Sequence, residues 1–166
     1  MIMIEMRAWK LRPGSDIKTI ERVLKGSKVR LDYEVPGLQS DMSRETLINL
    51  IRAHNPDRTD KGVRARAGQL ATLFNTVSKG DLAVVPRDKG KAIMIGKIIS
   101  RPSVVSGTCV EIRVDWINSN VPLDQFEQDL QYSFMAIHKF CGVSRNNAPE
   151  RLLQIANGHP DPGFSG

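Results

Sequence analysis

The sequence predicts an α+β fold in which a small curved sheet or partly closed β-barrel is flanked by helices. Five apolar stretches have the length and residue types of β-strands, and segments of helical periodicity separate the early ones. The late strand candidates are joined by links of hairpin length. With 166 residues and 40% hydrophobic side chains, the chain suits one domain with a real core.

The first half of the chain contains two strand candidates and three helix candidates. The stretch "MIMIEMRAWKL" alternates loosely and predicts a strand that ends near Leu11, followed by a short helix that Gly26 closes. Residues 28–35 predict a second strand. Ser43 is suited to cap the next helix, and an apolar stripe over residues 63–77 predicts a third.

The second half is expected to hold three further strands and two helices. The strands are expected over residues 81–86, 92–100 and 110–116. Residues 123–140 have a helical period, and a final helix is expected within residues 144–158. We expect the domain to cover residues 1–157 and residues 158–166 to form a linker or tail.

Charge is unevenly distributed along the chain. Residues 1–101 hold 20 Lys and Arg against 11 Asp and Glu, whereas residues 102–166 hold 4 against 7. A basic N-terminal two-thirds favours a polyanionic partner. No membrane span is expected, because no run of about 18 apolar residues occurs. The absence of a secretion signal, together with Cys109 and Cys141 as reduced core thiols, favours a cytoplasmic location.

Common catalytic and cofactor motifs fail when they are checked position by position. A phosphate-binding loop ending at Gly90-Lys91 would need Gly at position 85 and Ser or Thr at position 92, where Val85 and Ala92 stand. The three histidines have no metal-ligand spacing and no CxxC pair accompanies them. We therefore expect neither a metal nor another cofactor.

A nuclease of the PD-(D/E)xK type also fails this check. Pro56-Asp57 fits the first half of that motif, but no later lysine has an acid two residues before it. The two metal-binding carboxylates and the lysine are thus not arranged as this chemistry requires. We expect this chain to be non-catalytic, with room for a nuclease domain elsewhere in a longer polypeptide.

Several short patterns occur in a suggestive order: "WKLRPG", "LDYE", "AGQL", "KGDLAVVP", "IGKI" and, later, "VDWI". Their order and spacing resemble the N-terminal module of Mrr-like, modification-dependent restriction endonucleases. That module is similar to the EVE and YTH domains of the PUA-like superfamily. The resemblance covers roughly residues 4–155. It implies a PUA-like barrel that binds nucleic acid and holds a flipped, modified base in a pocket.

The resemblance also implies which residues line that pocket. Tyr33 matches the aromatic of one pocket wall, and the amide of Gln69 matches "AGQL". No aromatic follows "IGKI", so Pro102 or Val104 is the candidate for a flatter second wall. The alternative to these pocket roles is purely structural: Trp9 belongs to the core, and the amide of Gln69 links a helix to a strand by hydrogen bonds. The base-pocket set is Trp9, Lys10, Leu11, Arg12, Tyr33 and Gln69.

Two basic clusters are candidates for contacts with the phosphate backbone. The first leads into a predicted helix N-terminus, where backbone N–H groups add to the attraction for phosphate. The second forms the tip of a predicted hairpin. The alternative for both is a solvated surface. The first cluster is Arg58, Lys61, Arg64 and Arg66, and the second is Arg87, Lys89 and Lys91.

The resulting functional hypothesis is a nucleic-acid-binding module that reads modified bases by base flipping, as the specificity domain of a restriction endonuclease. DNA is preferred over RNA as the partner, and a C-terminal nuclease domain in the same polypeptide is envisaged. The sequence specifies no oligomeric state. The alternative is a protein-interaction or small-ligand sensor module with no nucleic-acid role, which the missing second aromatic favours.

Overall fold

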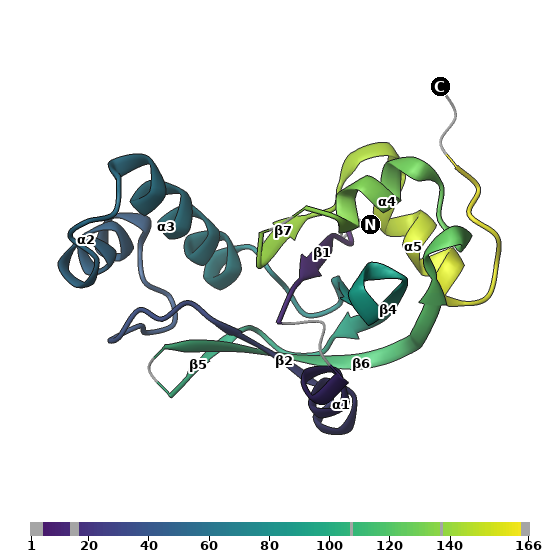
Figure 1. Cartoon of the computed structure of the whole chain (residues 1–166), viewed down its shortest axis with the longest axis horizontal. Helices are drawn as coiled ribbons and strands as arrows, with labels where there is room; N and C mark the ends of the chain where they lie inside the picture. Colours follow the sequence, from purple (N-terminus) through teal and green to yellow (C-terminus); the bar gives the residue numbers. More distant parts are fainter. Residues whose placement is uncertain (1–4, 14–16, 107, 137, 164–166) are drawn as a thin grey trace.

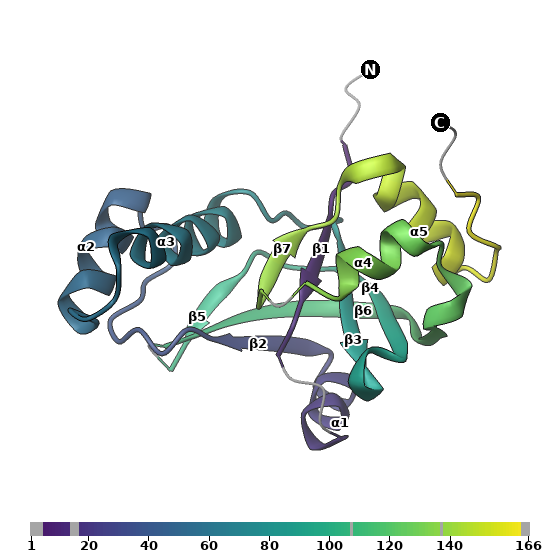
Figure 2. The same ribbon diagram turned by 45° about the horizontal axis from the view of Figure 1, so that its top comes forward.

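A curled sheet forms the centre of the molecule and gives it a half-barrel shape (Figures 1 and 2). The computed structural model describes residues 5–13, 17–106, 108–136 and 138–163. Within them the strand order is β2-β6-β4-β3-β1-β7, and β5 pairs with β6. The one parallel pairing among these is β1 with β3. The strands are β1 (Ala8–Leu11), β2 (Lys28–Asp32), β3 (Leu82–Arg87), β4 (Ala92–Ile98), β5 (Ser103–Val105), β6 (Cys109–Pro122) and β7 (Phe140–Gly142).

Helices cover the two ends of this sheet. The pair α2 and α3 lies at one end, α4 and α5 lie at the other, and α1 lies beside β2 (Figure 1). None of the helices in the described ranges is long and apolar enough to cross a membrane. The predicted α+β class with a curved sheet and flanking helices is confirmed. The helices are α1 (Ile17–Gly26), α2 (Arg44–His54), α3 (Asp60–Asn75), α4 (Gln128–Phe134) and α5 (Ala148–Ala156).

The helices α2 and α3 each begin at a side-chain cap. The Ser43 hydroxyl accepts a hydrogen bond from the Thr46 N–H at 3.2 Å, which confirms the predicted cap of α2. Thr59 does the same for α3 by accepting from the Gly62 N–H at 3.1 Å. These caps set where each helix begins, and so they fix which side chains of α3 face the sheet.

The central strands are buried on both faces. Trp9 and Leu11 belong to a core shared with α2 and α3, whereas Ala8 belongs to a second core shared with α4 and α5. The same alternation runs along β3, where Ala83 faces the first core and Leu82 the second. Double-sided burial explains why β3 and β4 read as continuous apolar runs.

Gly96 allows β6 to approach β4 closely enough for the sheet to curl. A Cβ at this position would lie 2.4 Å from Cγ1 of Val114 and 2.8 Å from the Asp115 carbonyl oxygen. The pairing register between β4 and β6 shifts directly before Gly96. Such an irregularity increases the local bend of the strand. The curvature therefore depends on the missing side chain at this position.

Three strand and helix expectations need correction. The helix expected over residues 123–140 ends at Phe134, and Phe140–Gly142 instead form β7, which pairs antiparallel with β1. Ile137, part of the expected apolar stripe, lies outside the described residues. Tertiary pairing explains this change, because the free edge of β1 accepts β7 through bonds such as Arg12 N–H to the Lys139 carbonyl (2.8 Å). The strand β5 was not expected, and β6 runs six residues past the expected end at 116.

The segment after α5 is tied back to the body by a buried arginine. Arg151 is 2% exposed and forms ion pairs with Asp129 of α4 (2.7 Å) and with Asp161 beyond α5 (2.9 Å). Asp161 also accepts a hydrogen bond from the Glu127 N–H at 2.9 Å. The expected boundary between residues 157 and 158 stays a prediction, but packing continues at least as far as Asp161.

Candidate functional site

A cavity of about 340 Å³ lies where β1, α3 and β7 meet, and we call it the β1–α3–β7 cavity. Its walls combine two aromatic rings, an amide, an imidazole, a thiol and two glycines. Two residues of the predicted base pocket, Trp9 and Gln69, line it. The complete lining is Trp9, Gly68, Gln69, Thr72, His138, Phe140, Cys141 and Gly142.

Trp9 is held rigidly at the inner wall of this cavity. Its indole N–H donates to Asp81 at 2.8 Å, and its ring stacks on Phe140 with centroids 5.1 Å apart. Asp81 also accepts from the Ser78 N–H at 3.0 Å. Trp9 is only 7% exposed, so it belongs to the core and to the cavity wall at once.

Gln69 projects from α3 and lies against Tyr33. The Tyr33 hydroxyl is 3.5 Å from Oε1 of Gln69, which is long for a hydrogen bond. Burial raises the pKa of Tyr33 well above its usual range, so the hydroxyl stays protonated and can only donate to that oxygen. The amide nitrogen of Gln69 makes no hydrogen bond to the described residues.

The Tyr33 ring does not line the cavity. It is 1% exposed, and two cations lie over it: the Arg66 guanidinium at 5.8 Å and the Lys139 ammonium at 5.7 Å from the ring centroid. Arg66 also donates to the Tyr33 carbonyl at 2.5 Å, and Lys139 donates to the Asp32 carbonyl. A base could stack on Tyr33 only after one of these cations had moved, so that role stays a prediction.

Two glycines leave the cavity wall without side chains. Gly68 lies in the middle of α3, and a Cβ built there meets no atom within 4 Å. Gly142 of β7 lies over Trp9, where a Cβ would be 3.4 Å from the indole ring. Glycine inside a helix is less favourable than alanine by roughly 0.5–1 kcal/mol. Packing does not require Gly68, and its absence of a side chain keeps the cavity open.

The remaining predicted pocket residues do not share this cavity. Lys10 follows Trp9 in β1, and successive side chains of a strand point to opposite faces. Lys10 is fully buried beneath the segment after α4, where its ammonium donates to the Ala136 carbonyl, and burial lowers its pKa. Arg12 donates to the same carbonyl at 3.4 Å. Leu11 is fully buried in the first core.

Arg12 lines a second cavity of about 300 Å³, together with Lys89 of the β3–β4 turn. A predicted pocket residue and a predicted backbone-contact residue therefore lie together. The exposed Met135 contributes an apolar wall to the same cavity. Of the six predicted pocket residues, Trp9 and Gln69 line the first cavity and Arg12 lines the second, whereas Lys10, Leu11 and Tyr33 line neither of these two.

The basic cluster at the start of α3 is partly occupied by internal contacts. Asp60 pairs with Arg64 (2.9 Å) and with Arg52, and these two hydrogen bonds lower the pKa of its carboxyl. Burial, with the neighbouring Arg58, lowers the pKa of Arg66. The exposed side chains of Arg58 and Lys61 make no hydrogen bond or ion pair within the described residues. They are the cations of this cluster best placed to meet an anion.

The hairpin tip divides in a similar way. Arg87 donates to the Ser119 carbonyl at 2.9 Å and lies 3.3 Å from Asp88, so it holds the turn. Lys89 adopts the left-handed conformation with φ 58°, and both Lys89 and Lys91 are exposed. The two lysines are available to a polyanion, whereas Arg87 has a structural role.

The sequence reasoning missed Phe140, Gly142 and Gly68 as cavity residues. Phe140 was assigned to the helix expected over residues 123–140, and Gly142 to the segment that follows it. The apolar run from Phe140 to Val143, followed by a polar turn, was a signal for a short strand. Gly68 carried a signal of its own, because a glycine inside an otherwise regular helical pattern needs a reason.

Comparisons with known proteins give a structural likeness. No protein-family model matches the chain, and no curated protein matches it. Among solved structures, the chain is similar to the YTH domain of Mmi1, determined in complex with RNA. The sequence identity is 8%, the match covers 92% of this chain and 78% of that chain, and the TM-score is 0.48.

Proposed function

We propose that this chain is a nucleic-acid-binding module that takes one base of the bound strand into the β1–α3–β7 cavity. The observation that carries the proposal is the meeting of Trp9, Phe140 and Gln69 in one cavity. Aromatic rings contact the apolar surface of a base, and an amide reads its hydrogen-bonding edge. A glutamine can donate and accept at once, as an adenine edge requires.

The distribution of charge supports a polyanionic partner. The chain carries a formal net charge of +6, and the exposed Arg58 and Lys61 stand at the start of α3, the helix that carries Gln69. Lys89 and Lys91 add exposed cations at the β3–β4 turn. Phosphate contacts from these residues would position the strand, whereas the cavity would supply the specificity.

The finer assignment rests on the order of sequence motifs. It makes the partner DNA with a modified base, flipped out of the duplex, and makes the chain the specificity domain of a restriction endonuclease. A nuclease domain in the same polypeptide then performs cleavage, and this chain has no catalytic role. In this assignment Tyr33 holds the amide of Gln69 in position, and its stacking on the base requires displacement of Arg66 or Lys139.

Binding to short oligonucleotides tests the proposal. Fluorescence anisotropy would compare duplexes carrying 5-methylcytosine or N6-methyladenine with unmodified DNA and RNA, each at two salt concentrations. Wild-type protein should bind with an affinity that falls steeply with salt. Gln69→Ala should reduce discrimination between modified and plain strands, and Arg58→Gln should weaken both alike.

One observation favours the rival function, a protein-interaction or small-ligand module. The two aromatic rings of the cavity, Trp9 and Phe140, stack on each other, and two cations lie over the Tyr33 ring outside it. A base in this cavity would therefore meet rings that already contact each other. If no oligonucleotide binds in a salt-dependent way, the nucleic-acid proposal fails and this rival replaces it.

A further inference from the structure

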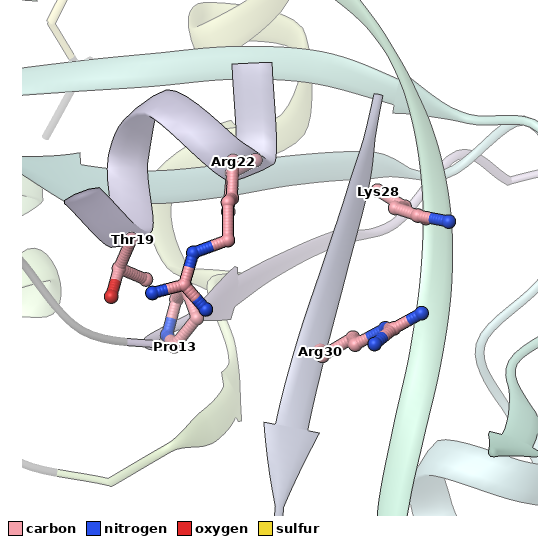
Figure 3. A pocket seen from close by; sticks show the side chains of 6 residues that line it. Pro13, Thr19, Arg22, Lys28 and Arg30 are labelled. Carbon is pink, nitrogen blue, oxygen red and sulfur yellow. The ribbon is translucent and has the colours of Figure 1, made fainter. Parts of the chain in front are cut away.

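A third cavity, whose lining includes three basic side chains, lies beside β2. It has a volume of about 330 Å³ and lies between α1 and β2. Its lining differs from that of the β1–α3–β7 cavity, because it contains charged side chains and no aromatic ring (Figure 3). Its lining is Pro13, Thr19, Arg22, Val23, Lys28 and Arg30, and we call it the α1–β2 cavity.

The strand β2 supplies two of its three cations by simple alternation. Val29 and Leu31 face the core, so Lys28 and Arg30 must both point outward. Figure 3 shows these two side chains extending in the same direction from β2, over β6 and on the side of β2 opposite Arg22. Side-chain exposures of 37% and 56% leave both within reach of solvent.

One buried carboxylate holds these two cations in place. Glu111 lies directly opposite Arg30 in the β2–β6 ladder and is 8% exposed. Its Oε1 is 3.1 Å from Nε of Arg30 and 3.7 Å from the Lys28 ammonium. The two terminal nitrogens of the Arg30 guanidinium make no hydrogen bond to the other described residues.

Arg22 supplies the third cation from the other wall. It extends from α1 toward Pro13 (Figure 3), and it makes no ion pair or hydrogen bond within the described part of the chain. A single exposed arginine is common on protein surfaces, but Arg22 lines the same cavity as two other cations. Among the described lining residues there are three cations and no carboxylate, and Glu111 pairs with two of these cations from outside the lining.

We propose that the α1–β2 cavity binds the phosphate group of a nucleotide, with Arg22 and Arg30 donating to the phosphate oxygens. Guanidinium groups donate two parallel hydrogen bonds to phosphate, and they do so more strongly than neutral donors. The side chains of Pro13 and Val23 provide an apolar wall for the sugar or base. The volume is at the lower end of the roughly 300–1,000 Å³ of small-ligand sites.

Two sources can supply this phosphate: the backbone of a nucleic-acid strand or a free mononucleotide. Binding of a strand phosphate rests on the proposed function of the chain, whereas binding of a free mononucleotide does not. The chemistry is the same in both, so the experiment must separate the sources.

The first test is a nuclear magnetic resonance titration of the whole chain with inorganic phosphate and with adenosine 5′-monophosphate. Amide signals of residues 19–30 should move with saturation, and the nucleotide should bind more tightly than phosphate. Arg22→Gln should weaken nucleotide binding at least roughly tenfold. The matched control is Lys18→Gln, which removes the same charge from α1 at an exposed position outside the cavity.

Arg22 is exposed and Arg22→Gln should leave the fold intact, which circular dichroism would confirm. Equal weakening by Lys18→Gln would overturn the site, because it would show attraction to general positive charge only. The proposed site would also be overturned by two results together. The amide signals of residues 19–30 would stay in place with both ligands, and Arg22→Gln would leave the salt dependence of oligonucleotide binding unchanged.

The second test separates the two sources of phosphate. If a strand phosphate occupies the cavity, Arg22→Gln should reduce the slope of log affinity against log salt by about 0.7–0.9, one phosphate contact. If a free nucleotide is the ligand, that slope stays unchanged while nucleotide binding is lost. Gln69→Ala should alter neither the titration nor the slope, so failure of base reading and failure of this site are told apart.

Discussion

Gly68→Ala should make the protein more stable and a poorer ligand binder at the same time. The change adds one methyl group to the wall of the β1–α3–β7 cavity, in the middle of α3. A Cβ at this position meets no atom within 4 Å, so no repacking opposes it. Alanine is favoured over glycine in a helix interior by roughly 0.5–1 kcal/mol. The free energy of unfolding should rise by about that amount.

The same methyl group takes up space that a bound base would need. Overpacking of a filled site is unfavourable by at least about 1 kcal/mol, which corresponds to a roughly fivefold loss of affinity. Thermal unfolding would measure the stability, where a gain of roughly 1–4 °C in Tm is expected for a chain of this size. Fluorescence anisotropy with methylated and plain oligonucleotides would measure the affinity.

The matched control is Ala65→Gly, at an exposed position of the same helix. It should lower stability by roughly 0.5–1 kcal/mol and leave affinity unchanged. The pair would show that stability and binding move independently at α3. If Gly68→Ala stabilises the protein but binds with wild-type affinity, the cavity is not the ligand site and the reasoning is refuted.

Three further predictions follow from the contacts around Tyr33 and Arg151. Tyr33→Phe should change the free energy of unfolding by no more than about 1 kcal/mol, since it removes one long hydrogen bond, yet it should weaken base discrimination by releasing Gln69; unchanged discrimination in anisotropy measurements would contradict this positioning role. Arg151→Met should lower the free energy of unfolding by roughly 3–5 kcal/mol in urea titrations, because it leaves the buried Asp161 carboxylate unpaired. Hydrogen bonds from Arg151 lower the pKa of Asp129 from its ordinary 3.8 to about 2, so the ionised Asp129 adds to the free energy of unfolding above pH 4, and this addition is lost as the pH falls toward 2. Asp129→Asn should remove that acid-dependent loss. If the free energy of unfolding of this variant still falls with pH as in the wild type, the assignment is wrong.

Local patterns accounted for most of the elements and failed where pairing was long-range. The apolar stripe of α3 and the cap at Ser43 depend on neighbours within a few residues, so the sequence shows them directly. The strand β7 exists because the edge of β1 is close in space. The partner strand lies more than 120 residues earlier in the chain, and the helical period of residues 123–140 was followed too far.

The candidate site was predictable in part for a similar reason. Trp9 and Gln69 line one cavity, and their role in binding a base stays a prediction. Lys10 could have been separated from Trp9 from the sequence alone, because neighbouring residues of a strand point to opposite faces. The burial of Tyr33 was not accessible in this way. Arg66 and Lys139 cover its ring from distant parts of the chain.

The burial of β1, β3 and β4 on both faces restricts where variation can occur in this fold. Most side chains of those strands point into one core or the other, so most polar replacements at these buried positions would unfold the protein before they changed any recognition. The two cavities that carry our proposals lie instead at the two margins of the sheet, against β7 and against β2. A saturation mutagenesis map should therefore show an intolerant centre between two permissive margins, and new ligand preferences should arise at those margins.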